Sequence, residues 1–180
     1  MFKFRFSEAC SRGDKNEAKR LYERNPAILN QQNSHGWTGL MCSLIGEHHT
    51  VSRWLLGRPG HDTGLTTISI AYTALHIACR YSAPLDIVVQ LAELARRQGT
   101  LNRKDDSGRT GLDWAVKYGH TSIALHLAWL GAGCRVEYKL WPEGVTLQTW
   151  LDAGLAQVCL FWNSFLNKCG LCRYLNLESN

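Results

Sequence analysis

A unit of about 35 residues recurs along this chain, and residues 110–136 carry its fullest copy. A threonine that follows a Gly-containing turn opens this copy. Apolar side chains then recur on one helical face, at Leu112, Ala115 and Val116. Gly119-His120 ends the first helical pattern and a second one follows. The unit therefore predicts two short helices joined by a tight turn.

The same unit begins at Phe4, Thr38 and Thr73, and in a weaker form at Val145. Together with Thr110, these starting positions are separated by 34, 35, 37 and 35 residues. Fixed-period similarity of this size indicates helix pairs that stack on one another, because a single pair cannot bury its own apolar face.

The helix starts are specific enough to show a resemblance. They read Thr-Gly-Leu-Met at 38–41, Thr-Ala-Leu-His at 73–76 and Thr-Gly-Leu-Asp at 110–113. The chain resembles the ankyrin-repeat family, whose helix start is Thr-Pro-Leu-His, although no copy keeps the Pro and only His76 keeps the His. The resemblance implies an all-α solenoid of stacked helix-turn-helix units joined by short β-turn fingers.

Repeat boundaries follow from this register. We expect ankyrin-like repeats over residues 1–136, divided near 1–36, 37–71, 72–108 and 109–136. Periodicity fades beyond residue 136, so we expect a degenerate fifth repeat or helical cap at 137–167 and a tail at 168–180. The length also leaves open whether this chain is a piece of a longer protein.

One turn departs from the pattern. Asn33 and Gly36 precede Thr38 at the same offsets as Asp105 and Gly108 precede Thr110. Before Thr73 the corresponding residues are Ile68 and Ala71, and the stretch 65–72 is β-prone. We therefore predict a longer or differently shaped finger there.

Composition sets limits on the class of protein. A chain of 180 residues with 45% hydrophobic and 19% charged residues suits one globular domain. A net charge of +5 permits an acidic partner but lacks the concentrated basic tracts typical of nucleic-acid binding. We expect neither export nor a membrane span, because the first residues lack the apolar core of a secretory signal and no stretch of about 18 apolar residues occurs. Cys10 and Cys79 occupy the same buried helix position, which suggests reduced thiols in the cytoplasm or nucleus.

No set of residues predicts catalysis, so we expect neither an enzyme nor a cofactor or metal site. His48-His49 and His61 lack neighbouring carboxylates or thiols at ligand spacing. Cys169 and Cys172 have the spacing of a zinc or redox pair, but only Cys159 stands near them and zinc needs about four ligands.

The resemblance also implies a binding surface. In ankyrin-like stacks, the residue before each threonine and those seven and eight positions after it tend to face the concave side. The basic and aromatic residues at such positions are Arg12, Trp37, Tyr72, Arg80, Tyr81, Arg109, Lys117 and Tyr118. Tyr, Trp and Arg are enriched at binding hot spots. We expect a groove for another protein, specifically an acidic or phosphorylated segment.

An alternative places the function in the C-terminal part, where aromatic residues crowd a helical pattern with few charges. These residues are Trp150, Phe161, Trp162 and Phe165. Either they form the core of the cap, or they recruit a larger complex, as ubiquitin-ligase adaptors do, or they form a dimer. We expect a monomer, and nucleic-acid binding is the less favoured third reading.

Overall fold

The computed structural model describes residues 4–132, which fold into helix pairs. The helices are α1 (Arg5–Ser11), α2 (Lys15–Arg24), the 3-10 helix η1 (Pro26–Asn30), α3 (Gly39–Ile45), α4 (His49–Leu56), α5 (Ala74–Arg80), α6 (Leu85–Arg97), α7 (Gly111–Lys117) and α8 (Thr121–Trp129). These residues contain no strand, so the all-α prediction is confirmed. The predicted cap at 137–167 and tail at 168–180 lie outside the described residues.

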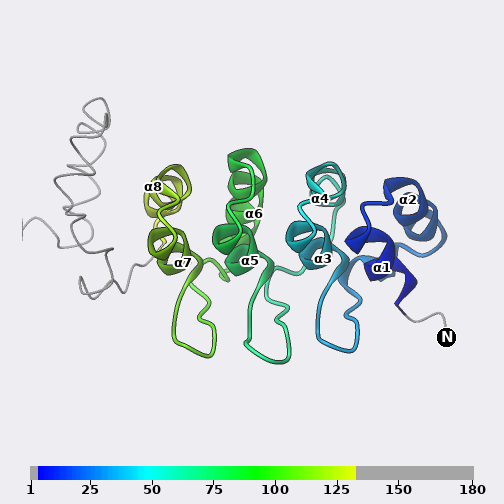
Figure 1. Cartoon of the computed structure of the whole chain (residues 1–180), viewed down its shortest axis with the longest axis horizontal. Coiled ribbons are helices and arrows are strands. Elements are labelled where there is room, and N and C mark those ends of the chain that lie inside the picture. Colours follow the sequence, from blue (N-terminus) through cyan, green and yellow to red (C-terminus); the bar gives the residue numbers. More distant parts are fainter. Residues whose placement is uncertain (1–3, 133–180) are drawn as a thin grey trace, which may run out of the picture. The chain divides into compact units, whose positions relative to one another are not determined.

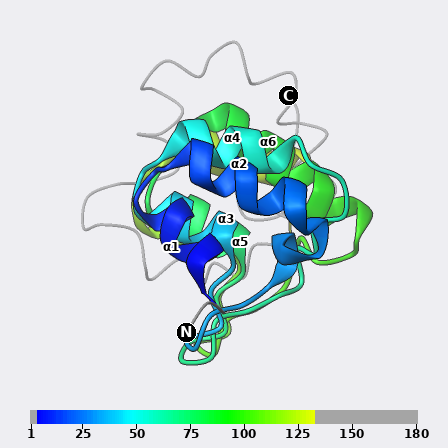
Figure 2. The same ribbon diagram turned by 90° about the vertical axis from the view of Figure 1, so that its right-hand side faces the viewer.

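The helix pairs stack in sequence order into two layers (Figure 1). The first helices of the pairs, α1, α3, α5 and α7, pack against one another, and α4, α6 and α8 form the second layer with α2 at its start. The loops between pairs project together to one side of the helices as fingers (Figures 1 and 2). The described part is therefore a solenoid in which each pair contacts mainly its neighbours.

Threonine fixes the start of three inner helices. The hydroxyls of Thr38, Thr73 and Thr110 accept a hydrogen bond from the backbone N–H three residues later. The side chains of His76 and Asp113 in turn accept a hydrogen bond from the backbone N–H of the capping threonine. This second bond completes a capping box at α5 and at α7. The first copy begins at Phe4 and has no such cap.

The aligned apolar positions form the core between the layers. Ala9, Ser43, Ala78 and Ala115 occupy one register position, and each has no exposed surface. Small side chains are needed here because neighbouring inner helices approach closely. Ser43 is the polar exception; its hydroxyl donates to the Leu40 carbonyl and is 2.9 Å from the Ser52 hydroxyl.

The turn within each pair requires one residue with left-handed backbone conformation. Gly13 and Gly119 fill this place in the first and fourth pairs, with φ of 74° and 71°. Glu47 and Ser82 fill it in the second and third pairs, with φ of 56° and 51°. Glu47 and Ser82 therefore hold a left-handed backbone conformation, which costs about 1 kcal/mol or more for a residue other than Gly.

The finger before Thr73 differs from the others, as predicted, and is one residue longer. In the regular fingers the N–H of Asn33 bonds to the Trp37 carbonyl, and that of Asp105 to the Arg109 carbonyl. In the odd finger the equivalent bond runs from Thr67 to Tyr72, five residues apart instead of four.

Two details of the odd finger correct the sequence interpretation. Thr67, not Ile68, takes the role of the turn-forming Asn or Asp, because its hydroxyl accepts from the Tyr72 N–H. Ala71 does replace the glycine, with φ of 51°, but the β-prone stretch forms a turn and no strand. The inserted residue shifts the register by one position, which offset counting from Thr73 could not detect.

Candidate partner-binding site

Six of the predicted binding residues lie close together along α5 and α7. Some come from the fingers that precede these helices and the others from the C-terminal ends of the helices. Tyr72 and Arg109 end their fingers, Arg80 is the last residue of α5, and Lys117 is the last residue of α7. Together with the ring of Trp114 they form one group, here called the cation–aromatic cluster: Tyr72, Arg80, Tyr81, Arg109, Trp114, Lys117 and Tyr118.

Arg80 lies at the centre of the cluster. Its guanidinium carbon is 4.9 Å from the Trp114 ring centre and 5.7 Å from that of Tyr118. It is 5.8 Å from the Tyr72 ring centre and 5.6 Å from that of Tyr81. Its Nη1 donates to the Tyr72 hydroxyl over 2.9 Å. These contacts hold the guanidinium in one place and cover part of it with aromatic surface.

Trp114 is the buried floor of the cluster, with only 3% of its surface exposed. The Arg109 guanidinium and the Lys117 ammonium lie 5.1 Å and 4.7 Å from its ring centre. Its indole N–H donates to Asp105 over 2.8 Å. The other Asp105 oxygen accepts from the backbone N–H groups of Ser107 and Arg109, so this carboxylate is committed to holding the finger and the indole.

Further rings brace the cluster. Tyr118 stacks on Trp114 with ring centres 5.7 Å apart, and His120 stacks on Tyr118 at 6.1 Å. The His120 Nε2 also donates to the Arg80 carbonyl over 3.4 Å. These contacts join the third and fourth helix pairs beside the three cations.

No carboxylate of residues 4–132 forms an ion pair with the three cations, although Asp105 is bonded to the indole beside them. Because each lies close to the same Trp114 ring, no two of them can be farther apart than 10.0 Å, the sum of the two longest distances to its centre. In the described part of the chain, ion pairs are formed by Lys19, Arg20, Arg53 and Arg96, and none includes a cluster cation. The cluster therefore presents a local excess of positive charge.

Burial raises the pKa of the Tyr72 hydroxyl, while the neighbouring Arg80 opposes that rise. The hydroxyl therefore stays protonated at neutral pH and accepts the Arg80 hydrogen bond as a neutral group. Tyr72 is 8% exposed, so it offers a partner little surface, and its hydroxyl instead accepts a hydrogen bond from Arg80. Tyr81 and Tyr118 are each 43% exposed, and Lys117 is exposed as well.

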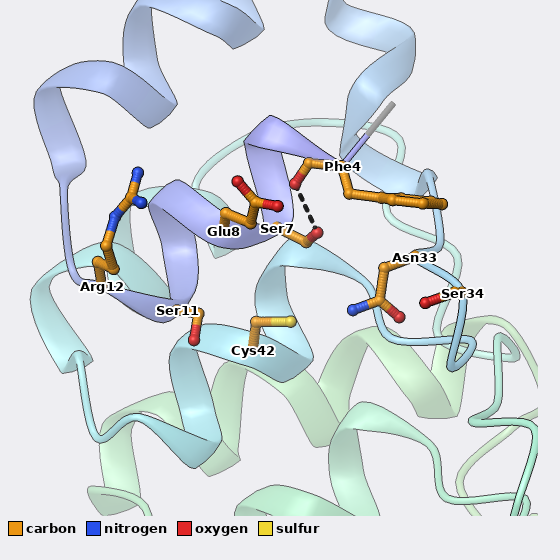
Figure 3. Close-up of a pocket in the computed structure, with 8 residues that line it drawn as sticks. All are labelled: Phe4, Ser7, Glu8, Ser11, Arg12, Asn33, Ser34 and Cys42. Atoms are coloured by element: carbon orange, nitrogen blue, oxygen red, sulfur yellow. Dashed lines mark hydrogen bonds between the residues drawn. The ribbon is translucent and has the colours of Figure 1, made fainter. Parts of the chain in front are cut away.

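Arg12 and Trp37 do not join this cluster. Arg12 lines a separate hollow of about 310 Å³ at the first two pairs, with Phe4, Ser7, Glu8, Ser11, Asn33, Ser34 and Cys42 (Figure 3). Trp37 is half-buried, and its backbone bonds to Asn33 in the first finger. The predicted alternative surface at Trp150, Phe161, Trp162 and Phe165 lies outside the described residues.

Sequence reasoning missed Trp114, Asp105 and His120 as parts of the site. Trp114 stands four residues after its threonine, where the second and third pairs have Cys42 and Ile77 and the first pair has Glu8. A large aromatic residue at a position filled by smaller side chains in the other pairs was the available signal. The pairing of Trp114 with Asp105 depends on a finger folding back over the helix, which the spacing alone does not show.

Two of the histidines singled out by the sequence form hydrogen bonds that link neighbouring segments. His48 donates to the Ser11 carbonyl, and His61 to that of Leu55. Among residues 4–132 no group of three or more His, Cys, Asp or Glu side chains is arranged to hold a metal ion. Cys10, Cys42 and Cys79 are buried and form no disulfide. Within the same residues no helix is both long and apolar enough to cross a membrane.

Comparison with known proteins agrees with this geometry. Residues 53–139 match the family model of ankyrin repeats, in three copies. No curated protein matches the chain. Ankyrin repeats mediate protein–protein interactions, and the family typically supplies a binding module without catalysis of its own. With the stacked helix pairs, capped threonine starts and projecting fingers, the match shows that residues 53–139 of the chain carry ankyrin repeats.

Proposed function

We propose that the chain is a non-catalytic adaptor or scaffold that binds an acidic segment of another protein at the cation–aromatic cluster. One observation carries this proposal: Arg80, Arg109 and Lys117 gather over one buried indole, and no described carboxylate forms an ion pair with any of them. A partner that supplies negative charge would complete the arrangement.

The magnitude of the repulsion supports this reading. Two unit charges 10 Å apart repel by about 0.4 kcal/mol in water and by about 1.7 kcal/mol at an effective dielectric constant of 20. Since 10.0 Å is the largest possible separation, the actual repulsion is at least of this order before screening by salt. An acidic partner would turn this cost into attraction and would also speed its own approach.

The aromatic rings contribute in a second way. They hold the Arg80 guanidinium in place before a partner arrives, so little side-chain entropy is lost on binding. Tyr81 and Tyr118 remain 43% exposed beside it and offer apolar contact area. Charged groups beside rigid aromatic area are typical of the energetically important centre of an interface.

Charge reversal tests the proposal. Lys117 is exposed, so Lys117→Glu should leave folding intact while it weakens capture of the partner from a lysate by at least about tenfold. Lys15→Glu, at the exposed start of α2, is the matched control and should have no effect. Equal losses from both variants, or no loss from Lys117→Glu, would show that the partner binds elsewhere.

We also infer that the protein works as a monomer in a reducing compartment, the cytoplasm or the nucleus. The three buried, unpaired cysteines support the compartment, because secreted domains of this size tend to oxidise their thiols in pairs. Light scattering on the purified chain and imaging of the tagged protein in cells are the respective tests.

A further inference from the structure

We infer that the cation–aromatic cluster recognises a phosphorylated side chain of the partner, a phosphomonoester dianion, in preference to a single carboxylate. This inference rests on the proposed function and names the chemistry of the bound segment. It follows from the number of cations, from the N–H donors that they keep free, and from the arginine–carboxylate pairs found elsewhere in the protein.

The cluster has more donors than one carboxylate can use. Within the described residues, Arg80 donates one side-chain hydrogen bond, to Tyr72, and the side chains of Arg109 and Lys117 donate none. Two guanidinium groups and one ammonium therefore keep most of their N–H donors for a ligand. A phosphomonoester offers three terminal oxygens and a charge between about −1.5 and −2 at neutral pH, whereas a carboxylate offers two oxygens and a charge of −1.

Two carboxylates of this protein, Asp86 and Glu17, are each paired with one arginine. Arg53 pairs with Asp86 between neighbouring helix pairs, through Nε at 2.6 Å and Nη2 at 3.0 Å. Glu17 is likewise held by Arg20 alone, through two bonds of 2.8 Å. Three cations lie within 10.0 Å of one another, and the Asp105 carboxylate on the same indole offsets one of their charges. The two positive charges that remain match a dianion better than a single carboxylate.

Partial burial strengthens the preference. Arg80 and Arg109 are half-buried, and aromatic rings lie against both guanidinium groups. Charge-assisted hydrogen bonds are stronger where water is partly excluded, and arginine forks suit the geometry of phosphate oxygens. Lys117 is exposed and adds a point charge 4.7 Å from the Trp114 ring centre.

The rings themselves are already used within the protein. Trp114 contacts Tyr72 and Tyr118, with ring centres 5.5 Å and 5.7 Å apart, and Tyr118 also stacks on His120. Recognition of the phosphate group itself therefore depends on the N–H groups of the cations, and the ligand needs no aromatic ring of its own. Phosphoserine is accordingly the simplest probe.

Nuclear magnetic resonance titration of the full chain tests the inference. The probes are N-acetyl-phosphoserine amide and N-acetyl-glutamate amide at matched ionic strength, and the signals followed are the Trp114 indole N–H and the Tyr118 backbone N–H. We expect the phosphoserine probe to bind at least about tenfold more tightly than the glutamate probe. Lys117→Gln should weaken phosphoserine binding at least fivefold, and Lys15→Gln should leave it unchanged.

Three results would overturn the inference. Equal affinity for both probes would remove the preference for a dianion, while an acidic partner would still be able to bind. Phosphoserine binding that shifts signals in other repeats but not those of Trp114 and Tyr118 would place the phosphate site elsewhere. Absence of any shift with the phosphoserine probe would remove phosphate recognition, and the capture experiment with Lys117→Glu would then decide separately whether the cluster binds protein.

Discussion

Asp105→Asn isolates the hydrogen bond that ties the third finger to the cation–aromatic cluster. Asp105 is 6% exposed; one of its oxygens accepts from the Ser107 and Arg109 N–H groups, and the other from the Trp114 indole. Asparagine preserves the first oxygen, because Asn33 makes the same two turn bonds in the first finger. Its amide nitrogen would then face the indole N–H, and neither group can accept a hydrogen bond.

The expected cost follows from the burial of that donor. Trp114 is 3% exposed, so its indole N–H would find neither a protein acceptor nor free access to water. A buried donor left unpaired costs about 1–3 kcal/mol, and a bond lost to a charged acceptor lies at the upper end. For a chain of this size that corresponds to a melting temperature lower by roughly 2–12 °C.

A double-mutant cycle in urea gives the measurement. Trp114→Phe removes the donor, so Asp105→Asn should cost at least about 1 kcal/mol less in that background than in the natural chain. Asn33→Asp is the matched control and should change stability by less than about 0.5 kcal/mol, since Asn33 makes turn bonds but has no indole to hold. If Asp105→Asn costs the same with and without the indole, the bond does not stabilise the finger.

Three further predictions follow from local chemistry. Ser82→Gly should raise the free energy of unfolding by up to about 1 kcal/mol, because Ser82 holds a φ of 51°; a loss of stability in urea would contradict this. Burial lowers the pKa of His61 and of His76, so the unfolded chain binds protons more readily than the folded one. The free energy of unfolding should therefore have its full value above about pH 6.5 and should fall as the pH drops below it. Equal urea midpoints at pH 7.5 and 5.5 would contradict the lowered pKa values. Burial raises the pKa of Cys10 to about 12 and that of Cys42 to about 11, so both thiols should resist iodoacetamide at pH 8 until urea unfolds the chain; rapid labelling of the folded chain, followed by mass spectrometry, would contradict this.

Most of the described fold could be predicted from the sequence because the relevant forces act locally. A threonine three residues before an available backbone N–H caps a helix whatever lies around it, and Thr38, Thr73 and Thr110 all do so. The period then places equivalent apolar residues in one core. The left-handed turn positions held by Glu47 and Ser82 were harder to recognise, because glycine marks them only in the first and fourth pairs.

The candidate site was predictable only in part. Register placed Arg80, Lys117 and Tyr118 correctly near one another, because the inner helices repeat with a nearly constant spacing. Register could not show that Tyr72 is buried and bonded to Arg80, or that three cations from one finger and two helices lie close to the Trp114 ring. Those features depend on how individual side chains pack, and the contact of Arg80 with Trp114 also joins two repeats.

The most direct test of the central claim is a hydrogen-exchange footprint of the captured partner on the intact chain. We expect slower exchange on partner binding at the C-terminal ends of α5 and α7 and in the two fingers that end at Tyr72 and Arg109. The amides of α2, α4 and α6 should be unaffected. Protection centred on the second-layer helices, or confined to residues beyond 132, would contradict the assignment of the cation–aromatic cluster as the binding site.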